Sequence, residues 1–237
     1  MTSNFFSIAI PTYGYGGMGS NFLSKNLSVL TKQAFKDFEV VISDHSTDDT
    51  ILDVADSFSK KLDIKYVRNE IGRGVISPNI NNAIEYCEGE YIKILFQDDF
   101  LYDEYSLLCI AFHIMREGSR WYMSRFAHSN DGESLYREMT PKWTNDIYLG
   151  NNLLGCPSGF VGRAQHMQGE IKFDDGLNFY MDCDYYMKWH SLFGEPNIIP
   201  YITHVNRTWG ARLTDTIQQD QKNKELEVMV RRWGKSQ

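Results

Sequence analysis

The first half of the chain alternates between short apolar runs and longer amphipathic stretches, and this alternation restricts the fold more than any other feature. The apolar runs have the length of buried strands and lie at residues 5–10, 38–42, 64–67 and 91–95. Apolar residues recur at helical spacing in the segments 21–33, 51–62, 78–87 and 104–116. Strands that alternate with helices form a mostly parallel sheet covered on both faces, so the sequence predicts an α/β fold.

The second half of the chain has a weaker pattern. A segment rich in proline and glycine lies at 155–159, and helices are predicted at 182–193 and 220–233. The chain has 237 residues, which is enough for one large α/β domain. We therefore expect a domain with an irregular second half, followed by an amphipathic terminal helix.

Charge and composition exclude several classes of protein. The net charge is −7, whereas a general nucleic-acid binder carries a basic surface, so we expect no nucleic-acid partner. The four cysteines form no C-x-x-C pair, which indicates reduced thiols rather than a zinc site or disulfides. The longest uncharged stretch, 1–24, contains Pro11 and four glycines and is a poor membrane helix. Since the N-terminus also lacks the features of a signal peptide, we expect a cytoplasmic protein that touches membranes only through its surface.

Polar side chains follow three of the four predicted strands. Thr12 and Tyr13 come after the first strand, Asp44 after the second, and Asp98 and Asp99 after the fourth. Ligands of open parallel sheets bind outside the carboxyl ends of the strands, so these side chains should meet at one edge. A tyrosine can pack against a base, and a carboxylate pair can hold a divalent cation on a diphosphate. Each feature alone is typical of a turn, but together they predict a nucleotide site.

Several motifs along the chain resemble, in their order and spacing, those of one enzyme family. They are Ser7-Ile8-Ala9-Ile10-Pro11-Thr12-Tyr13, Ser28-Val29-Leu30 with Gln33 and Phe38-Glu39-Val40, Asp44-His45-Ser46-Thr47-Asp48, Asn81-Asn82-Ala83-Ile84 with Gly89-Glu90-Tyr91-Ile92, Gln97-Asp98-Asp99, and Asp182-Cys183-Asp184-Tyr185. The region 5–215 therefore resembles the family 2 glycosyltransferases, which have the GT-A fold. In this comparison Gln97-Asp98-Asp99 is similar to the D-x-D-type metal motif of the family.

This resemblance implies an enzyme that transfers a sugar from a nucleotide-sugar donor to an acceptor hydroxyl with inversion. The donor would be a UDP-, GDP- or TDP-sugar, and the acceptor a saccharide or a lipid-linked saccharide. Such enzymes take part in bacterial-type polysaccharide, lipopolysaccharide or glycoconjugate synthesis. The implied organisation is a GT-A domain at 1–215 and an amphipathic helix at 216–237. Within the domain, residues 1–100 form the nucleotide-binding half and 101–215 the acceptor half.

The resemblance also implies roles for single residues. Asp182 matches the catalytic base, and Asp99 matches the residue that holds a Mn²⁺ or Mg²⁺ ion on the donor diphosphate. The residues expected to bind the donor nucleotide are Pro11, Thr12, Tyr13, Asp44, Arg73, Asp98 and Arg207. Cys156-Pro157-Ser158 resembles a loop on the acceptor side.

Some positions allow two interpretations. Trp209 replaces a C-terminal histidine of the family, which leaves a third metal ligand open, and His204 is either its substitute or a structural residue. Asp184 is either a further site residue or a carboxylate that interacts with the helix dipole. On a helix it points in a different direction from Asp182, so only one of the two should face the reaction. Arg73 is either a phosphate ligand or a solvated loop cation.

Two other functions compete with sugar transfer. The glycines at 16–19 are similar to the phosphate-binding loop of a nucleotidyltransferase, but Ser20 follows where that family has arginine. A non-catalytic carbohydrate-binding or scaffold protein on the same fold is the second alternative. The presence of both Asp99 and Asp182 argues against it.

The terminal helix carries both apolar and basic residues. The apolar residues are Leu226, Val228, Met229 and Trp233, and the basic residues are Lys222, Lys224, Arg231, Arg232 and Lys235. One interpretation is peripheral contact with anionic lipid at the inner membrane face. The other is that the apolar side packs on the domain or on a second subunit, as in a homodimer.

Overall fold

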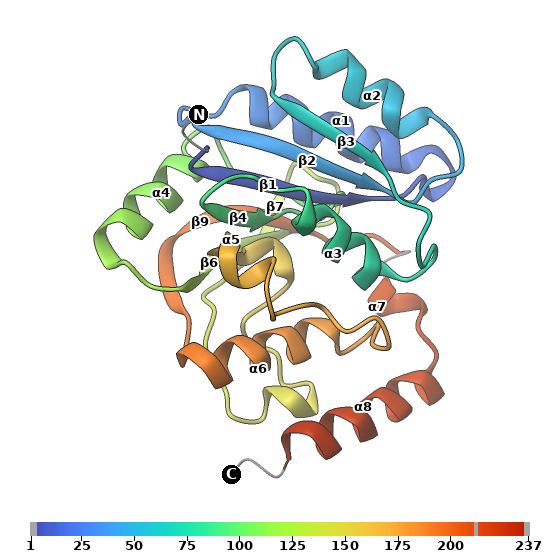
Figure 1. Cartoon of the computed structure of the whole chain (residues 1–237), viewed down its shortest axis with the longest axis vertical. Helices are drawn as coiled ribbons and strands as arrows, with labels where there is room; N and C mark the ends of the chain where they lie inside the picture. The colour runs from blue at the N-terminus through green and yellow to red at the C-terminus, as the bar shows by residue number, and fades with distance from the viewer. Residues whose placement is uncertain (1–3, 211–212, 235–237) are drawn as a thin grey trace.

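The computed structural model describes residues 4–210 and 213–234, which form a nine-stranded mixed sheet with helices on both faces (Figure 1). The strand order is β3-β2-β1-β4-β8-β6-β9-β5, and β7 pairs with β6. The strands are β1 (Phe6–Thr12), β2 (Phe38–Asp44), β3 (Ile64–Arg68), β4 (Tyr91–Ile94), β5 (Phe100–Leu101), β6 (Trp121–Ser129), β7 (Leu135–Met139), β8 (Phe160–Arg163) and β9 (Asn197–Arg207).

The helices follow the strands in the order that the sequence predicts. The α-helices are α1 (Met18–Thr31), α2 (Thr50–Phe58), α3 (Ile76–Glu85), α4 (Ser106–Glu117), α5 (Ala164–Met167), α6 (Met181–Phe193), α7 (Leu213–Thr216) and α8 (Gln219–Trp233). Short 3₁₀ turns lie at η1 (Tyr15–Gly17), η2 (Ile147–Leu149) and η3 (Pro157–Gly159). Strands β1 to β4 pair in parallel with β1 in the centre, which confirms the α/β fold.

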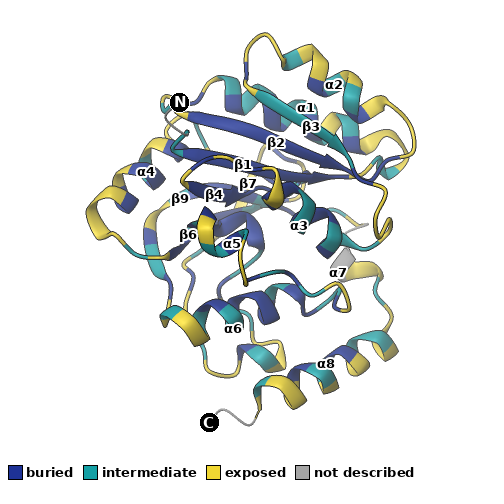
Figure 2. Cartoon of the chain, in the orientation of Figure 1, coloured by how far each residue is buried: buried dark blue, intermediate teal, exposed yellow. Residues whose placement is uncertain are grey.

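The sheet separates two apolar cores. On β1, Phe6, Ile8 and Ile10 point into one core, which α1, α2 and α4 cover. Ala9 points into the other core, to which α3, α6 and α8 contribute. Figure 2 shows that β1 and β2 are buried along their length, that β3 at the edge of the sheet is partly exposed, and that the helices are buried mainly on the side facing the sheet. Successive residues of β1 point into opposite cores because side chains along a strand alternate between the two faces of the sheet.

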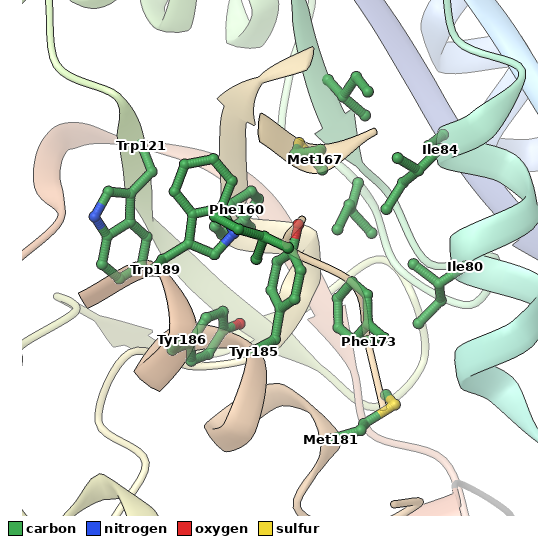
Figure 3. Packing of buried hydrophobic residues seen from close by; sticks show 14 of the residues in the cluster. Ile80, Ile84, Trp121, Phe160, Met167, Phe173, Met181, Tyr185, Tyr186 and Trp189 are labelled. Carbon is green, nitrogen blue, oxygen red and sulfur yellow. The ribbon is translucent and has the colours of Figure 1, made fainter. Parts of the chain in front are cut away.

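The second core contains a cluster of aromatic rings (Figure 3). Trp121, Phe160, Tyr185, Tyr186 and Trp189 are all fully buried there. The rings pack at angles typical of aromatic clusters, with 5.3 Å between the centroids of Phe160 and Trp189. Much of the high aromatic content therefore fills a core and does not face a ligand.

The second half of the chain contains more strand than its sequence indicates. Strands β6 and β9 have 9 and 11 residues and pair in parallel, whereas β8 joins β4 antiparallel. Strand β6 is buried almost throughout and shows no apolar–polar alternation. Strand β9 contains Pro200, which argues against a strand in a sequence pattern. The sheet is thus parallel in the first half and mixed in the second.

The glycine-rich loop after β1 has a structural explanation. Gly16 and Gly17 have φ angles of 62° and 95°, which favour glycine. A Cβ atom at Gly19 would lie 2.0 Å from the carbonyl oxygen of Tyr13. Helix α1 begins at Met18, earlier than the predicted Asn21, because the loop winds directly into it. The glycines serve this tight turn.

Helix α8 packs its apolar side on the domain. Met229 is fully buried, and Leu226, Val228 and Trp233 lie against the second core. The four apolar residues of α8 therefore pack on the domain. Lys235 lies outside the described residues. Within the described part of the chain, no helix combines the length and apolar character needed to cross a membrane.

Candidate active site

A cleft opens where β1 and β4 end and α6 begins. Its cavity measures about 420 Å³ and is lined by Pro11, Asp98, Asp99, Asp182 and Arg207, among others. A second cavity of about 340 Å³ adjoins it, because Pro11, Tyr15, Ile76 and Gln97 line both. Thr12 and Tyr13 line this second cavity. The fold thus brings together seven of the predicted site residues, from both halves of the chain.

Hydrogen bonds fix the orientation of the Asp99 side chain, which lines the cleft. It is 3% exposed, and its Oδ1 accepts from the backbone N–H of Arg207 at 3.0 Å and from Asn206 Nδ2 at 3.2 Å. Its Oδ2 accepts from the Cys156 thiol at 3.3 Å. Burial and the neighbouring Asp98 carboxylate raise the pKa of Asp99. The carboxylate is therefore oriented in advance by three donors.

Asp98, Arg207 and Trp209 form a connected group beside Asp99. Trp209 Nε1 donates to Asp98 Oδ2 at 2.8 Å, and Arg207 Nε donates to the Asp98 carbonyl oxygen at 3.0 Å. The guanidinium of Arg207 also lies over the rings of Phe22 and Phe100. Trp209 thus contacts a cleft carboxylate through its indole N–H.

The carboxylate pair fits a divalent cation of a particular kind. Among residues 4–210 and 213–234, no three His, Cys, Asp or Glu side chains are grouped so that they could hold a metal ion. Mg²⁺, however, is commonly bound through one or two carboxylates together with substrate phosphates and water. Because Asp98 raises the pKa of Asp99, a cation near the pair would offset an unfavourable charge. Asp98 and Asp99 therefore suit an ion that arrives with the donor.

Asp182 enters the same cleft from the acceptor half. It is the second residue of α6, and its Oδ1 accepts from the backbone N–H of Cys183 at 2.7 Å. Its Oδ2 accepts from Asn152 Nδ2 at 2.8 Å. Burial raises the pKa of the Asp182 carboxyl, although both hydrogen bonds lower it. A carboxylate with a raised pKa is a stronger base, which suits the removal of a proton from a hydroxyl.

Asp184 points away from the cleft. It is fully buried, and its carboxylate contacts Lys188 Nζ at 2.7 Å and Arg232 Nη1 at 2.6 Å. Trp233 Nε1 donates to it at 2.9 Å. Asp184 therefore joins α6 to α8, and only Asp182 of the two faces the cleft.

The predicted nucleoside residues differ in their surroundings. Thr12 and Tyr13 line the second cavity, and Tyr13 is 47% exposed. Asp44 is fully buried, and its carboxylate accepts from the Tyr66 hydroxyl at 2.7 Å and from the Ser46 N–H at 2.9 Å. The adjacent His45 lines the second cavity. The role of Asp44 as a base ligand stays a prediction, and in this conformation its side chain stabilises the loop after β2.

Arg73 and His204 line neither of the two cavities. Arg73 is exposed and reaches Glu70 Oε1 at 3.4 Å. His204 is fully buried, and its ring stacks on Phe126 with 5.3 Å between centroids. Its Nδ1 lies 3.3 Å from the Ser124 hydroxyl. Burial lowers the pKa of His204 well below its ordinary value, so the ring is neutral and its surroundings fit the structural interpretation.

Several residues of the cleft are not among those that the sequence motifs indicate. Tyr15, Asn152 and Asn206 all line the main cavity. Asn152 binds Asp182, and Asn206 binds Asp99. Asn206 directly precedes Arg207, so its position in the sequence was a usable signal. Asn152 lies 30 residues from its partner, with no motif around it.

Comparison with known proteins identifies the family. Residues 7–177, more than half of the chain, match the sequence profile of the glycosyl transferase family 2. The chain belongs to this family. The nucleotidyltransferase alternative therefore finds no support in the family match.

The curated relatives of this family 2 chain are longer proteins. A poly(ribitol-phosphate) beta-N-acetylglucosaminyltransferase, TarS of Staphylococcus aureus, is 30% identical over 101 residues, which are 42% of this chain and 17% of the relative. The validoxylamine A glucosyltransferase of Streptomyces hygroscopicus is 42% identical over 80 residues, which are 32% and 18%. The sequence matches thus span less than a fifth of the length of these two relatives.

Solved structures confirm the fold of this family 2 chain. The crystal structure of TarS from S. aureus matches 95% of the chain and 39% of that protein, with a TM-score of 0.74 and 22% identity. A complex of TarS residues 1–349 with UDP-GlcNAc matches 95% and 66%, with a TM-score of 0.69 and 21% identity. At such identities the likeness shows the fold, which is the GT-A fold expected from the sequence.

Proposed function

We propose that this chain is a glycosyltransferase that moves a sugar from a nucleotide-sugar donor to an acceptor hydroxyl with inversion. One observation carries the proposal. Asp98 and Asp99 from the donor half and Asp182 from the acceptor half line one cleft. A site for a leaving diphosphate and a base for a nucleophile therefore share one cavity. A scaffold protein that only binds carbohydrate has no need for this arrangement.

A UDP-sugar is the donor that we propose. TarS of S. aureus has been solved with UDP and with UDP-GlcNAc, whereas a mannosyltransferase from Pyrobaculum calidifontis has been solved with GDP-Man and Mn²⁺. In this chain, the cavity lined by Thr12 and Tyr13 adjoins the Asp98–Asp99 cleft. A nucleoside in the second cavity and its diphosphate in the first would match this layout. A GDP- or TDP-sugar is the other class to test.

The proposed reaction is a single displacement. Asp182 accepts the proton of the acceptor hydroxyl as the hydroxyl oxygen forms a bond to the anomeric carbon. The bond from that carbon to the diphosphate oxygen breaks, and its electron pair leaves with the nucleoside diphosphate. One displacement at the anomeric carbon inverts its configuration. Asn152 and the Cys183 N–H hold the Asp182 carboxylate in the orientation for this transfer.

A Mn²⁺ or Mg²⁺ ion is the proposed cofactor, held by Asp99 with Asp98 beside it. Such an ion, when bound, offsets the negative charge of the leaving diphosphate. Arg207 lines the same cleft, and a guanidinium is well suited to phosphate oxygens. The chain therefore offers a carboxylate pair for the cation and a fixed cation of its own.

A cell-wall polymer or a lipid-linked glycoconjugate is the proposed class of acceptor. The names of the relatives include a poly(ribitol-phosphate) transferase and, in Campylobacter jejuni, a GalNAc(5)-diNAcBac-PP-undecaprenol beta-1,3-glucosyltransferase. We further propose a cytoplasmic location, with peripheral contact at the inner membrane face. Since the apolar side of α8 packs on the domain and Arg232 pairs with Asp174 and Asp184, the exposed Lys224 and Arg231 would make this contact. The homodimer also stays a prediction.

Donor turnover tests the proposal. The full chain is incubated with UDP-, GDP- and TDP-sugars, with Mn²⁺, Mg²⁺ or EDTA, and release of nucleoside diphosphate is measured with and without saccharide acceptors. We expect release from UDP-sugars that depends on the metal and that Asp182→Asn reduces in the presence of acceptor. Binding of saccharide without turnover of any donor would instead favour the carbohydrate-binding alternative.

A further inference from the structure

The start of helix α6, which carries Asp182, is held by the distant helix α8. In Figure 1, α8 lies below α6, at the end of the molecule farthest from strands β1 to β3. The residue before α6, Tyr180, makes no side-chain capping hydrogen bond. The first N–H groups of a helix, and those just before it, need partners from elsewhere when they are buried. For α6, part of these partners come from α8.

Glu225 of α8 binds the backbone of the two residues that directly precede α6. Its Oε2 accepts from the N–H of Phe179 at 2.7 Å and from the N–H of Tyr180 at 3.1 Å. Its Oε1 accepts from Gln221 at 2.9 Å. Glu225 is only 4% exposed. A buried carboxylate is costly unless it is hydrogen-bonded, so Glu225 favours the one arrangement in which both N–H groups reach it.

Arg232 holds the same helix start from the other side of Asp182. Its Nη1 contacts Asp184 Oδ1 at 2.6 Å, and its Nη2 contacts Asp174 Oδ2 at 2.7 Å. Asp184 lies in the first turn of α6, and Asp174 lies in the loop before it. The Arg232 guanidinium therefore joins the loop before α6 to the first turn of α6. Trp233 adds a hydrogen bond to Asp184.

We propose that Glu225 and Arg232 are positioning residues for Asp182. Their partners are at 179 and 180 on one side of Asp182 and at 184 on the other, so α8 fixes the backbone on both sides of the base. A displacement of about 1 Å at a catalytic group can cost about 10²-fold in rate. Helix α8 is thus part of the catalytic architecture. This inference rests on the proposed function, in which Asp182 is the base.

Substitutions at Glu225 provide the first test. We expect Glu225→Ala to lower kcat about 10-fold to 10²-fold while the Kd for UDP stays that of the wild type, since the donor half is untouched. Glu225→Gln keeps an acceptor oxygen and should give an intermediate kcat. Glu227→Gln is the matched control, because Glu227 is exposed on the same helix. A folded Glu225→Ala variant with kcat within twofold of wild type would overturn the proposal.

Arg232 provides an independent pair of variants. Arg232→Gln removes the contacts to Asp184 and Asp174, whereas Arg231→Gln removes an exposed arginine one position earlier. We expect kcat to fall in the first variant and not in the second, with the Kd for UDP unchanged in both. Equal kcat values in the two variants, or a parallel loss of UDP binding in Arg232→Gln, would contradict positioning. If Glu225→Ala does not fold, Glu225→Gln and the arginine pair decide.

A structural measurement separates this inference from the proposed function. If the wild type transfers no sugar from any donor, the proposed function fails, but the position of Asp182 can still be measured. We expect crystals of Glu225→Gln or Arg232→Gln to show the Asp182 carboxylate displaced from Asn152 Nδ2. An Asp182–Asn152 hydrogen bond that stays at its 2.8 Å in both variants would overturn the inference.

Discussion

The donor wall and the acceptor wall of the cleft are built in different ways. On the donor wall, Thr12 ends β1 and Asp98–Asp99 follow β4, and these two strands are direct neighbours in the sheet. On the acceptor wall, Asp182 depends on Asn152, 30 residues away, and its helix depends on α8 through contacts over 45 to 49 residues. Backbone topology brings the donor-wall residues together, although Asn206 and Trp209, which are 107 and 111 residues away in sequence, also bind Asp99 and Asp98. The position of Asp182 depends on side-chain contacts between distant segments.

Under the proposed function, the two walls have separate tasks. The donor wall offers carboxylates, an arginine and aromatic rings, which suit binding of a charged nucleotide. The acceptor wall offers the Asp182 carboxylate, which Asn152 and the Cys183 N–H orient and which suits proton transfer. Substitutions on the acceptor wall should therefore change the rate of the chemical step, and those on the donor wall should change donor affinity.

The largest effect is expected for the base on the acceptor wall. Asp182→Asn keeps the shape of the side chain and removes the proton acceptor, so kcat should fall by about 10² to 10⁴-fold. The Kd for UDP, measured by calorimetry, should not change. If UDP affinity falls together with kcat, the two walls are not separable in the way described. If kcat stays near that of the wild type, Asp182 is not the base.

On the donor wall, Asp99→Asn should weaken binding and not only slow the reaction. The amide keeps an oxygen for Arg207 N–H and Asn206, but it removes the charge that would hold a cation. We expect the affinity for UDP in the presence of Mn²⁺ to fall about tenfold or more, or about 1.4 kcal/mol. Affinity in EDTA should be equal in both proteins. A variant that still gains wild-type affinity from Mn²⁺ would remove Asp99 as the metal ligand.

The pH dependence of kcat tests how Asn152 supports the base. Only the carboxylate form of Asp182 can accept a proton, so kcat should fall as the pH drops through the pKa of this group. Burial raises that pKa above the ordinary 3.8, while the Asn152 hydrogen bond lowers it. Asn152→Ala should therefore move the acid limb of the profile to higher pH. Cys183 and Tyr186 are the titratable groups beside Asp182, and both remain in this variant. If the acid limb of the kcat profile does not move, the assignment of Asp182 as the base supported by Asn152 is contradicted.

The same difference between the walls explains what the sequence could predict. Strand ends of a parallel sheet meet at one edge, so Pro11, Thr12, Asp98 and Asp99 could be brought together from the strand pattern alone. Arg207 lies at the end of β9, a strand that the pattern missed, and its position came only from the family resemblance. The sequence therefore predicted the donor wall largely from elementary rules.

The acceptor wall was less predictable because its contacts are not local. Nothing in the pattern around Asn152 indicates that it binds Asp182. Asp184 was correctly separated from Asp182 by helix geometry, but its partner Arg232 was considered as a charge for lipid. Asp44 shows the same limit on the donor side, since its contact with Tyr66 joins two strands. Side-chain contacts between distant segments require the folded structure.

The smallest effect is expected at Tyr13, at the outer end of the donor wall. Its ring is 47% exposed and lines the second cavity, so packing on a base would cover a surface that is now open to solvent. An aromatic contact contributes about 0.5–1.5 kcal/mol, so Tyr13→Ala should weaken UDP binding about 2-fold to 12-fold, with kcat at saturating donor unchanged. Tyr105→Ala is the matched control, because Tyr105 is 52% exposed and lines neither cavity. Equal UDP affinities in the two variants would show that the nucleobase of UDP does not pack on Tyr13. A fall in kcat with unchanged affinity would show that the donor wall also takes part in the chemical step.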